Sequence, residues 1–377
     1  MSGIYIHIPF CKQACHYCDF HFSTKREKQP EMVRAMAREL VLRKGETAGE
    51  PIGSIYFGGG TPSLLNKEEL LLLISAVYDN YPVSANPEIT LEANPDDLSD
   101  ATLKTMSGLG VNRLSIGVQS FIDRDLKLMN RAHDAREARA SLERATGYFE
   151  NISIDLIYGI PGLQMEEWEA NLQQALSYNI PHISSYALTV EPRTALKRFI
   201  DKGLVADVDD EAAEGHFLRM MDVLQKEGFV HYEISNFGKP GYFSQNNSAY
   251  WQGKPYLGIG PSAHSFDGSS RRWNLRNNPK YLRAIAEGKP AYEEEVLSEQ
   301  DRYNEYIMTG LRTIWGVSLE RVQTEYGLDY YDYLLQQAAG HLRGGLLVLE
   351  NDTMMVTRRG KFLADGIASD LFRIGRN

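Results

Sequence analysis

The stretch Cys11-Lys12-Gln13-Ala14-Cys15-His16-Tyr17-Cys18 contains all three cysteines of this 377-residue chain. It directly follows the apolar run Ile4-Tyr5-Ile6-His7-Ile8, which has the composition of a β-strand. Thiolates are the ligands that iron–sulfur clusters prefer. A cubane of four irons bound by this CxxxCxxC stretch would therefore keep one iron without a protein ligand. Such an open, Lewis-acidic iron can be chelated by a small molecule that carries an amine and a carboxylate.

Two other interpretations of the cysteines are open on spacing alone. A structural zinc site could use the three thiolates together with His7, His16 or His21, because short Cys/His clusters are typical of zinc. Three unrelated buried cysteines could also fall together by chance. Motifs further along the chain favour the iron–sulfur cluster.

The composition is that of an ordinary soluble globular protein, with 43% hydrophobic and 24% charged residues. The 40 basic and 50 acidic residues give a net charge of −10, which argues against nucleic-acid binding because that requires a basic face. No apolar stretch approaches the ~20 residues that span a bilayer, and the N-terminus lacks the plan of a signal peptide. Clustered free cysteines suit a reducing compartment. We therefore expect a cytoplasmic protein without a transmembrane segment.

Short β-branched or aromatic runs alternate with helical patterns along the first half of the chain, as in a parallel sheet. The six expected strands are Gly3 to Ile8, Ser54 to Phe57, Glu88 to Ala93, Arg113 to Val118, Ile152 to Tyr158 and Ile183 to Leu188. The expected helices between them are Glu31 to Leu42, Lys67 to Tyr78, Ala101 to Leu109, Ala135 to Tyr148 and Glu166 to Leu176. Six right-handed βα units predict an α/β fold, a partial (β/α)6 barrel of the TIM type.

Ligands collect at the C-terminal ends of the strands in such barrels. The informative residues stand at these ends: the cysteine loop after the first strand, glycines after the second, Glu92 at the third, Gln119 at the fourth and Asp155 at the fifth. The sequence therefore predicts that one end of the barrel carries the functional site.

The second half of the chain changes character twice. After a long helix, Asp209 to Lys226, the aromatic and glycine-rich segment Phe229 to Ser265 is expected to be irregular. Further helical patterns, a β-hairpin and a closing helix are expected at Tyr303 to Ile314, Leu319 to Tyr326, Tyr331 to Leu342, Leu346 to Val356 with its turn at Asn351-Asp352, and from Arg359. We expect three parts: a barrel over 1–230, an irregular segment packed on it over 231–297, and a small helical, winged-helix-like domain with a hairpin wing over 298–377.

The run Gly58-Gly59-Gly60-Thr61-Pro62 follows the second strand. Glycines there let the backbone approach a ligand, and successive amides can form an anion-binding nest. The alternative is a tight turn between a strand and a helix. Its place beside the cysteine loop favours the ligand site.

Six stretches in chain order strengthen this interpretation jointly. They are Tyr5 to Cys11, Phe57 to Pro62, Leu91 to Pro95, Ser115 to Phe121, Asp155 to Gly162 and Gly258 to His264. Together with CxxxCxxC they resemble the radical S-adenosylmethionine (SAM) superfamily, in the branch that contains the oxygen-independent coproporphyrinogen III dehydrogenase HemN and the heme chaperone HemW. The resemblance implies a 4Fe-4S cluster on Cys11, Cys15 and Cys18, with SAM on the open iron.

The same resemblance implies which residues contact SAM. They are Tyr5, Tyr17, Gly59, Gly60, Thr61, Glu92, Gln119, Arg131 and Asp155. Carboxylates can accept from the ammonium or hydroxyl groups of SAM, and an arginine can pair with its carboxylate. Each residue could instead be hydrogen-bonded to a neighbouring loop.

Two departures point to the HemW-like side of the branch. The dehydrogenase pattern CxxxCxxCxC has a fourth cysteine where this chain has Phe20, and a long arm ahead of the cluster where this chain has ten residues. The resemblance then implies a protein that binds heme and hands it to respiratory hemoproteins, with possible peripheral contact to the membrane. A SAM radical enzyme of porphyrin biosynthesis, acting on coproporphyrinogen III, is the alternative.

A third departure concerns heme. The HemW-like branch carries HNxxYW, whose histidine is a natural iron ligand, but this chain has Asn246 at that position. Asn247, Tyr250 and Trp251 remain to frame a porphyrin by packing, although an aromatic pair is more often core. His264 is the substitute candidate for the iron ligand, or else a structural hydrogen-bonding residue.

Overall fold

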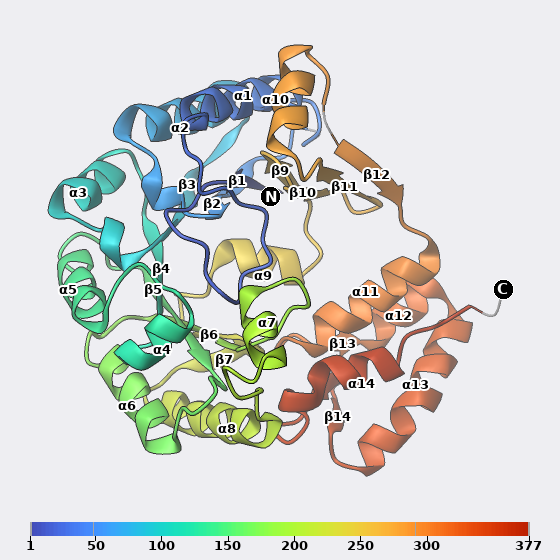
Figure 1. Ribbon diagram of the computed structural model, residues 1–377. Coiled ribbons are helices and arrows are strands. Elements are labelled where there is room, and N and C mark those ends of the chain that lie inside the picture. Colours follow the sequence, from blue (N-terminus) through green and yellow to red (C-terminus); the bar gives the residue numbers. More distant parts are fainter. Residues whose placement is uncertain (1, 48, 291, 376–377) are drawn as a thin grey trace.

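A computed structural model describes residues 2–47, 49–290 and 292–375 of the chain. Its largest element is a curved sheet of twelve strands in the order β12-β11-β10-β9-β1-β2-β3-β4-β5-β6-β8-β7. The strands curve round a common axis, which Figure 1 shows end-on, and helices cover the outside. The α/β barrel with a smaller C-terminal domain, predicted from the sequence, is confirmed.

All six predicted strands are present and pair in parallel, in chain order. They are β1 (Ser2–Ile8), β2 (Ile52–Gly59), β3 (Val83–Ala93), β4 (Arg113–Gln119), β5 (Ile152–Tyr158) and β6 (His182–Ala187). Side chains that face the helices are apolar and buried, as Ile4, Ile55 and Leu114 illustrate. Since successive side chains of a strand point to opposite faces, the positions between them face the inside of the barrel.

The predicted helices are present on the outer face of the sheet. They are α1 (Gln29–Leu42), α2 (Lys67–Asn80), α3 (Asp100–Gly108), α5 (Ala135–Ala145), α6 (Met165–Leu176) and α8 (Asp210–Lys226). Asn66 and Asp134 each start a helix with a capping box. The additional elements are short, too short for a helical period to show in the sequence: α4 (Asp123–Leu128), α7 (Ala195–Asp201) and the 3-10 turns Pro62–Leu64 and Pro95–Asp97.

The expectation of an irregular segment over 231–297 is wrong. The segment supplies strands to both ends of the sheet, and two helices: β7 (Val230–Glu233), β8 (Asn236–Gly238), α9 (Gln245–Trp251), β9 (Tyr256–Ile259), β10 (His264–Phe266), β11 (Ser270–Asn274), α10 (Asn278–Ala286) and β12 (Tyr292–Val296). Strands this short show little alternation, and their pairing with distant strands is decided by tertiary contacts. One glycine serves such a contact: a Cβ on Gly258 would lie 2.0 Å from the His264 carbonyl oxygen. The division at 230 and 297 stays a prediction.

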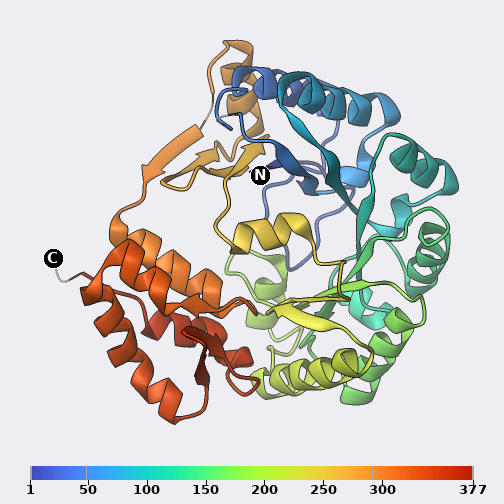
Figure 2. The same ribbon diagram turned by 180° about the vertical axis from the view of Figure 1, so that it is seen from behind.

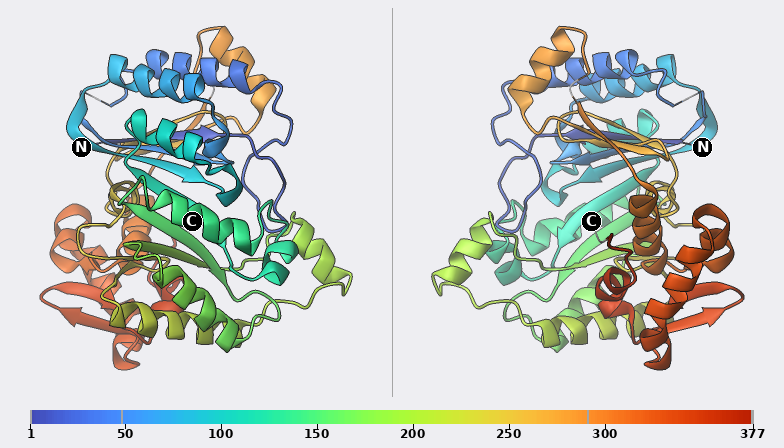
Figure 3. Two further views of the ribbon diagram at one scale, coloured as in Figure 1. Left: turned by 90° about the vertical axis from the view of Figure 1, so that its left-hand side faces the viewer. Right: turned by 90° about the vertical axis from the view of Figure 1, so that its right-hand side faces the viewer.

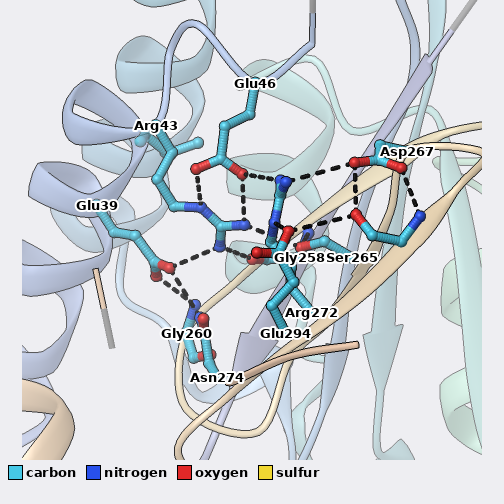
Figure 4. Close-up of polar contacts among 12 residues, drawn as sticks. Glu39, Arg43, Glu46, Gly258, Gly260, Ser265, Asp267, Arg272, Asn274 and Glu294 are labelled. Atoms are coloured by element: carbon cyan, nitrogen blue, oxygen red, sulfur yellow. Dashed lines mark hydrogen bonds and ion pairs between the residues drawn. The ribbon is translucent and has the colours of Figure 1, made fainter. Parts of the chain in front are cut away.

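A buried ion-pair network attaches the segment that runs from β9 to β11 to helix α1 (Figure 4). The Arg43 Nη1 donates to Glu39 Oε1 at 3.0 Å and to the Gly258 carbonyl at 2.8 Å. Glu39 also accepts from the Gly260 amide and from Asn274 Nδ2, both at 2.8 Å. Full hydrogen bonding is the condition under which a buried ion pair is tolerated. The turn after β9 is therefore held from α1, which gives that sequence motif a structural role.

The C-terminal domain has its own hydrophobic core, built around residues such as Tyr303, Leu334 and Met354. Its elements are α11 (Glu299–Leu311), β13 (Val317–Ser318), α12 (Leu319–Tyr326), α13 (Leu328–Arg343), β14 (Leu347–Glu350), β15 (Thr353–Val356), a 3-10 turn (Lys361–Leu363) and α14 (Ala364–Asp370). The predicted hairpin is confirmed, because Asn351 and Asp352 have φ values of 46° and 62°, as a two-residue type I′ turn requires.

The C-terminal domain contacts both ends of the curved sheet (Figures 1 and 2). Arg312 forms an ion pair of 3.0 Å with Glu233 of β7, and Arg271 of β11 pairs with Glu305 of α11 at 3.0 Å. The domain thus lies between the first and last strands of the sheet. Within the residues described, no helix is both long and apolar enough to cross a membrane.

Candidate functional site

The inner face of the barrel carries polar side chains. Inward positions of β1 to β5 include Tyr5, Tyr56, Glu92, Ser115 and Asp155. The interior of a packed TIM barrel is filled by layers of branched apolar side chains, whereas Tyr5, Glu92 and Asp155 remain partly accessible. The inner face is therefore suited to a polar ligand.

The cysteine loop leaves the C-terminal end of β1 and is anchored along its length (Figures 1 and 3). The Cys11 amide donates to the Ser23 carbonyl at 3.1 Å, and the His16 amide donates to the Met129 carbonyl at 3.0 Å. The His16 carbonyl in turn accepts from the Leu196 amide of α7 at 2.9 Å. These main-chain bonds connect the loop to the segment after α4 and to α7.

The three thiols of this loop are free and partly accessible. Burial, and then the neighbouring thiols, raise the pKa of Cys11 to about 11, a penalty that a bound cation reverses. Within residues 2–47, 49–290 and 292–375, no three His, Cys, Asp or Glu side chains are grouped as a single metal ion would need. In a four-iron cluster each thiolate binds a different iron, so the sulfurs need not converge on one point. The donor set fits such a cluster.

Arg131 links the cysteine loop to the strand ends. Its Nη1 lies 3.2 Å from Cys15 Sγ, and its Nη2 donates to Asn94 Oδ1 at 2.6 Å and to the Gly117 carbonyl at 2.9 Å. Its Nε is buried and has no hydrogen-bond partner in the described part of the chain. Because an unpaired buried donor is costly, this position suits a further acceptor such as a ligand carboxylate.

Glu92 and Asp155 are the two partly accessible carboxylates of the inner face. Tyr56 donates to Glu92 Oε1 at 2.8 Å, the Gly59 amide donates to Oε2 at 3.2 Å, and Ser115 donates to Asp155 at 3.1 Å. Burial raises the pKa of Glu92 to about 7 and that of Asp155 to about 6, and the Asp155 charge adds to the rise at Glu92. Two acids in such a setting favour a cation or hydroxyl donors. Asp155 lies in the middle of β5, deeper than the strand end where it was expected.

The remaining side chains expected at SAM lie on the inner face or in the loops at its C-terminal end. The Tyr5 ring stacks on Tyr56 with centroids 5.9 Å apart. Burial raises the pKa of Tyr17, which lies close to Arg131. Gln119 has a φ of 68°, a conformation that is uncommon for a non-glycine residue and tends to occur at functional sites.

Gly59 and Gly60, at the end of β2, pack closely against β1 and the residues that follow it. A Cβ on Gly59, whose φ is 104°, would lie 2.6 Å from the His7 ring, and one on Gly60 would lie 2.5 Å from the Phe10 carbonyl oxygen. The amides of Gly60 and Thr61 donate to main-chain carbonyls at the end of β1, at 2.8 and 2.7 Å. Since these amides are occupied, the anion-nest interpretation is wrong and the tight turn holds. Contact of Gly59, Gly60 and Thr61 with SAM through other atoms stays a prediction.

The aromatic residues expected to frame a tetrapyrrole lie away from the cysteine loop. Asn247, Tyr250 and Trp251 belong to α9, which lies behind the barrel in Figure 1 and in front of it in Figure 2, at the N-terminal ends of the strands. The Asn246 amide donates to Glu88 of β3 at 3.2 Å. Figure 3 shows the cysteine loop on the opposite side. The structure therefore does not bring α9 and the cysteine loop together.

Contacts of these residues are partly structural. Trp251 packs on the Arg312 guanidinium at 5.0 Å, which ties α9 to the C-terminal domain. Tyr250 is 43% exposed and so remains available to a partner. His264 is exposed at the start of β10, with its ring 6.4 Å from that of Trp273.

Three residues of the inner face were not among the expected site residues, although one of them, Ser115, begins the motif stretch Ser115 to Phe121. Tyr56 and Ser115 bind the two carboxylates, and Arg113 lies at the start of β4 on the same face. The signal that identifies them is the period of two: on each strand they alternate with buried apolar residues. Their mutual proximity depends on strand register, which the sequence alone does not supply.

Comparison with known proteins identifies two matching regions. The model of the radical SAM superfamily matches residues 5–175, and that of the HemN C-terminal domain matches residues 297–363. These regions contain the cysteine loop with most of β1 and the whole of β2 to β5, and the C-terminal domain up to the start of α14.

Full-length relatives and a solved structure extend the match. The heme chaperone HemW of Bacillus subtilis is 34% identical over 371 residues, which cover 97% of this chain and 98% of that protein. HemW of Escherichia coli is 32% identical, covering 97% and 96%. The radical SAM enzyme coproporphyrinogen III oxidase (HemN) from Escherichia coli has a TM-score of 0.86 at 24% identity, covering 98% of this chain and 89% of that chain, which shows a shared fold. The chain therefore belongs to the HemW family of the radical SAM superfamily.

Proposed function

We propose that this protein is a radical-SAM-type heme chaperone, which binds heme and transfers it to respiratory hemoproteins. The observation that carries the proposal is the likeness to heme chaperones over nearly the whole length of both chains. The polar, partly accessible inner face and the anchored cysteine loop support the same family role.

The family implies a 4Fe-4S cluster and SAM as cofactors. Cys11, Cys15 and Cys18 hold the cluster, which when bound supplies an electron and an open iron. In this proposal the buried Arg131 Nε donates to the carboxylate of SAM. Glu92 accepts from its ammonium or hydroxyl groups.

Further contacts complete the proposed SAM site. They come from Asp155, Gln119, Tyr5, Tyr17, Gly59, Gly60 and Thr61. Asp155 and Gln119 can bond to ribose hydroxyls, since a carboxylate accepts and an amide both donates and accepts. The two tyrosine rings supply apolar surface for the flat parts of the ligand.

Heme is the cargo in this proposal. Asn246 is a weak iron ligand, so an exposed histidine such as His264 takes the axial position. Asn247, Tyr250 and Trp251 frame the porphyrin by packing. The acceptors are respiratory hemoproteins, which the protein reaches from the cytoplasm by peripheral contact with the membrane.

Anaerobic reconstitution tests the proposal against the coproporphyrinogen oxidase alternative. We expect a four-iron complement, bound heme, and transfer of that heme to an apo-cytochrome. With SAM, a reductant and coproporphyrinogen III we expect no vinyl product, because Phe20, 71% exposed, occupies the position of the enzyme's fourth cysteine. Product above one turnover per protein would replace the chaperone with the dehydrogenase.

A further inference from the structure

Arg113 is a buried cation for which the described part of the chain offers no ion-pair partner. It is the first residue of β4, faces the inside of the barrel and is 2% exposed. Its Nε has no hydrogen-bond partner, and its guanidinium forms no ion pair with any residue that the structure describes. Burying an unpaired charge is costly, so a residue of this kind needs a compensating role.

The register places Arg113 directly beneath the two carboxylates. Its Cα pairs with Thr90 of β3, one inward position before the pair formed by Glu92 and Ser115. Asp155 lies on the next strand, one inward position beyond the residue that pairs with Ser115. Three adjacent strands therefore direct one cation and two acids into the same part of the barrel.

The charge of Arg113 acts on Glu92 and Asp155 although its side chain forms no hydrogen bond or ion pair with either of them. Burial is the main reason that the pKa values of Glu92 and Asp155 are raised, and the charge of Arg113 opposes that rise at both. Ligand access differs between them, since Glu92 and Asp155 remain partly accessible while Arg113 is almost fully covered. An effect of Arg113 on a ligand must therefore act through the carboxylates.

We propose that Arg113 is a positioning residue of the SAM site, which favours the ionised forms of Glu92 and Asp155 from beneath without contacting the ligand. The inference rests on the proposed assignment of these carboxylates to SAM. Ionised acceptors bind an ammonium or hydroxyl group more strongly than protonated ones do.

The surrounding groups do not replace this charge. The titratable and charged groups that interact electrostatically with Glu92 or Asp155, besides Arg113, are Tyr5, Tyr56, Tyr186 and Arg131. His182 and Tyr232 lie near Arg113 itself, and Glu88 and Glu233 near Tyr232. Arg131 is the permanent cation among them, and it already binds Asn94 and lies against Cys15. Burial lowers the pKa of His182 well below its usual value, so that its ring is neutral. Removing Arg113 therefore moves the pKa values of both acids further up.

SAM binding to reconstituted protein tests the inference. Arg113→Met removes the charge at similar volume, Arg113→Lys keeps it, and Thr90→Val changes the neighbouring inward position without a charge. SAM affinity is measured at several pH values between 6 and 8.5. At pH 7 we expect Arg113→Met to weaken SAM binding on the order of tenfold, the effect of moving a pKa by about one. The difference should shrink toward pH 8.5, while the other two variants follow the wild type. The amine of SAM titrates in the same way whichever variant is measured, so a difference in pH dependence between variants comes from the protein.

A second measurement needs neither cluster nor SAM. In apo-protein, the Tm of Arg113→Met relative to wild type should fall as the pH rises from 5 to 8, because the folded variant retains the protons of Glu92 and Asp155 to a higher pH than the folded wild type does. A residue that only fills space gives a constant difference. Arg113→Gln replaces the methionine variant if that does not fold. A constant Tm difference, or SAM affinity equal to wild type at every pH, overturns the inference. Failure of wild type to bind SAM would overturn the proposed function instead, and the unfolding measurement would still test Arg113.

Discussion

Glu92→Gln should make the apo-protein more stable at pH 8 and nearly unchanged in stability at pH 5. The pKa of Glu92 rises from its ordinary 4.5 to about 7, mainly through burial. Between these two values the unfolded chain ionises while the folded protein retains the proton. Stability that is present below pH 4.5 is therefore lost progressively as the pH rises to 7. Glutamine does not ionise, so the variant escapes this loss.

The size of the effect follows from the two pKa values. A difference of one in pKa corresponds to about 1.36 kcal/mol, so the whole loss is about 3 kcal/mol. About 2.5 kcal/mol of it falls between pH 5 and pH 8 by the linkage relation. The hydrogen bonds from Tyr56 and the Gly59 amide end on carboxylate oxygens, and an amide oxygen can keep one of them. Their partial loss costs about 1 kcal/mol at either pH and does not change the difference between the two.

Equilibrium urea unfolding of metal-free protein at both pH values measures this difference. Glu88→Gln is the matched control on the same strand, because both Glu88 oxygens accept amides of α9, at 3.0 to 3.2 Å, and the variant should lose stability at both pH values. The same Glu92→Gln variant should bind SAM about one to two decades more weakly, as expected for a lost charge-assisted hydrogen bond. A stability difference from wild type that is equal at pH 5 and pH 8 would refute the account of Glu92.

Three further predictions concern the metal, SAM and heme. Cys11→Ala, Cys15→Ala and Cys18→Ala should each abolish the cluster in an iron assay while circular dichroism stays unchanged, since main-chain bonds anchor the loop; full iron in any variant contradicts the ligand set. Asp155→Ala should weaken SAM binding by roughly one to two decades without loss of iron, and wild-type affinity would remove Asp155 from the site. Asn246→His should tighten heme binding and shift the visible spectrum toward imidazole ligation, while His264→Ala should weaken binding; no change in either variant would place heme elsewhere.

The sequence alone was enough to predict the six parallel strands and the place of the cysteine loop after the first of them. Strands such as β5 (Ile152–Tyr158) alternate buried apolar residues with inward polar ones, and this period and composition are local properties. The strands β7 to β12 escaped prediction because they are short and pair with residues far away in the chain, as Gly3 does with Tyr256. Local pattern does not encode such pairing.

The same difference between local pattern and tertiary contact decides which site residues the sequence could predict. Glu92, which lies inside a motif, and Arg131, which the resemblance implies, were expected at the site, and the structure places both near the strand ends. The glycines show the opposite case, because the triple glycine is as consistent with close packing as with a ligand nest, and only the hydrogen bonds of Gly60 and Thr61 decide between them. The position of α9 is likewise a tertiary fact: a motif does not indicate the end of the barrel on which it lies.

Glu88 and Glu92 lie on the same strand and face the same way, and the contrast between them separates structural from ligand-binding acids. Glu88 is buried, and its carboxylate accepts the Gln245 and Asn246 amides, so its bonding capacity is used within the fold. Glu92 is partly accessible, and its pKa is raised to about 7. A position that lowers stability at neutral pH without completing its own hydrogen bonds is better explained by a ligand than by the fold. By this criterion we propose that Glu92, Asp155 and Arg131 Nε face the ligand, whereas Glu88 holds α9 against the N-terminal end of the barrel.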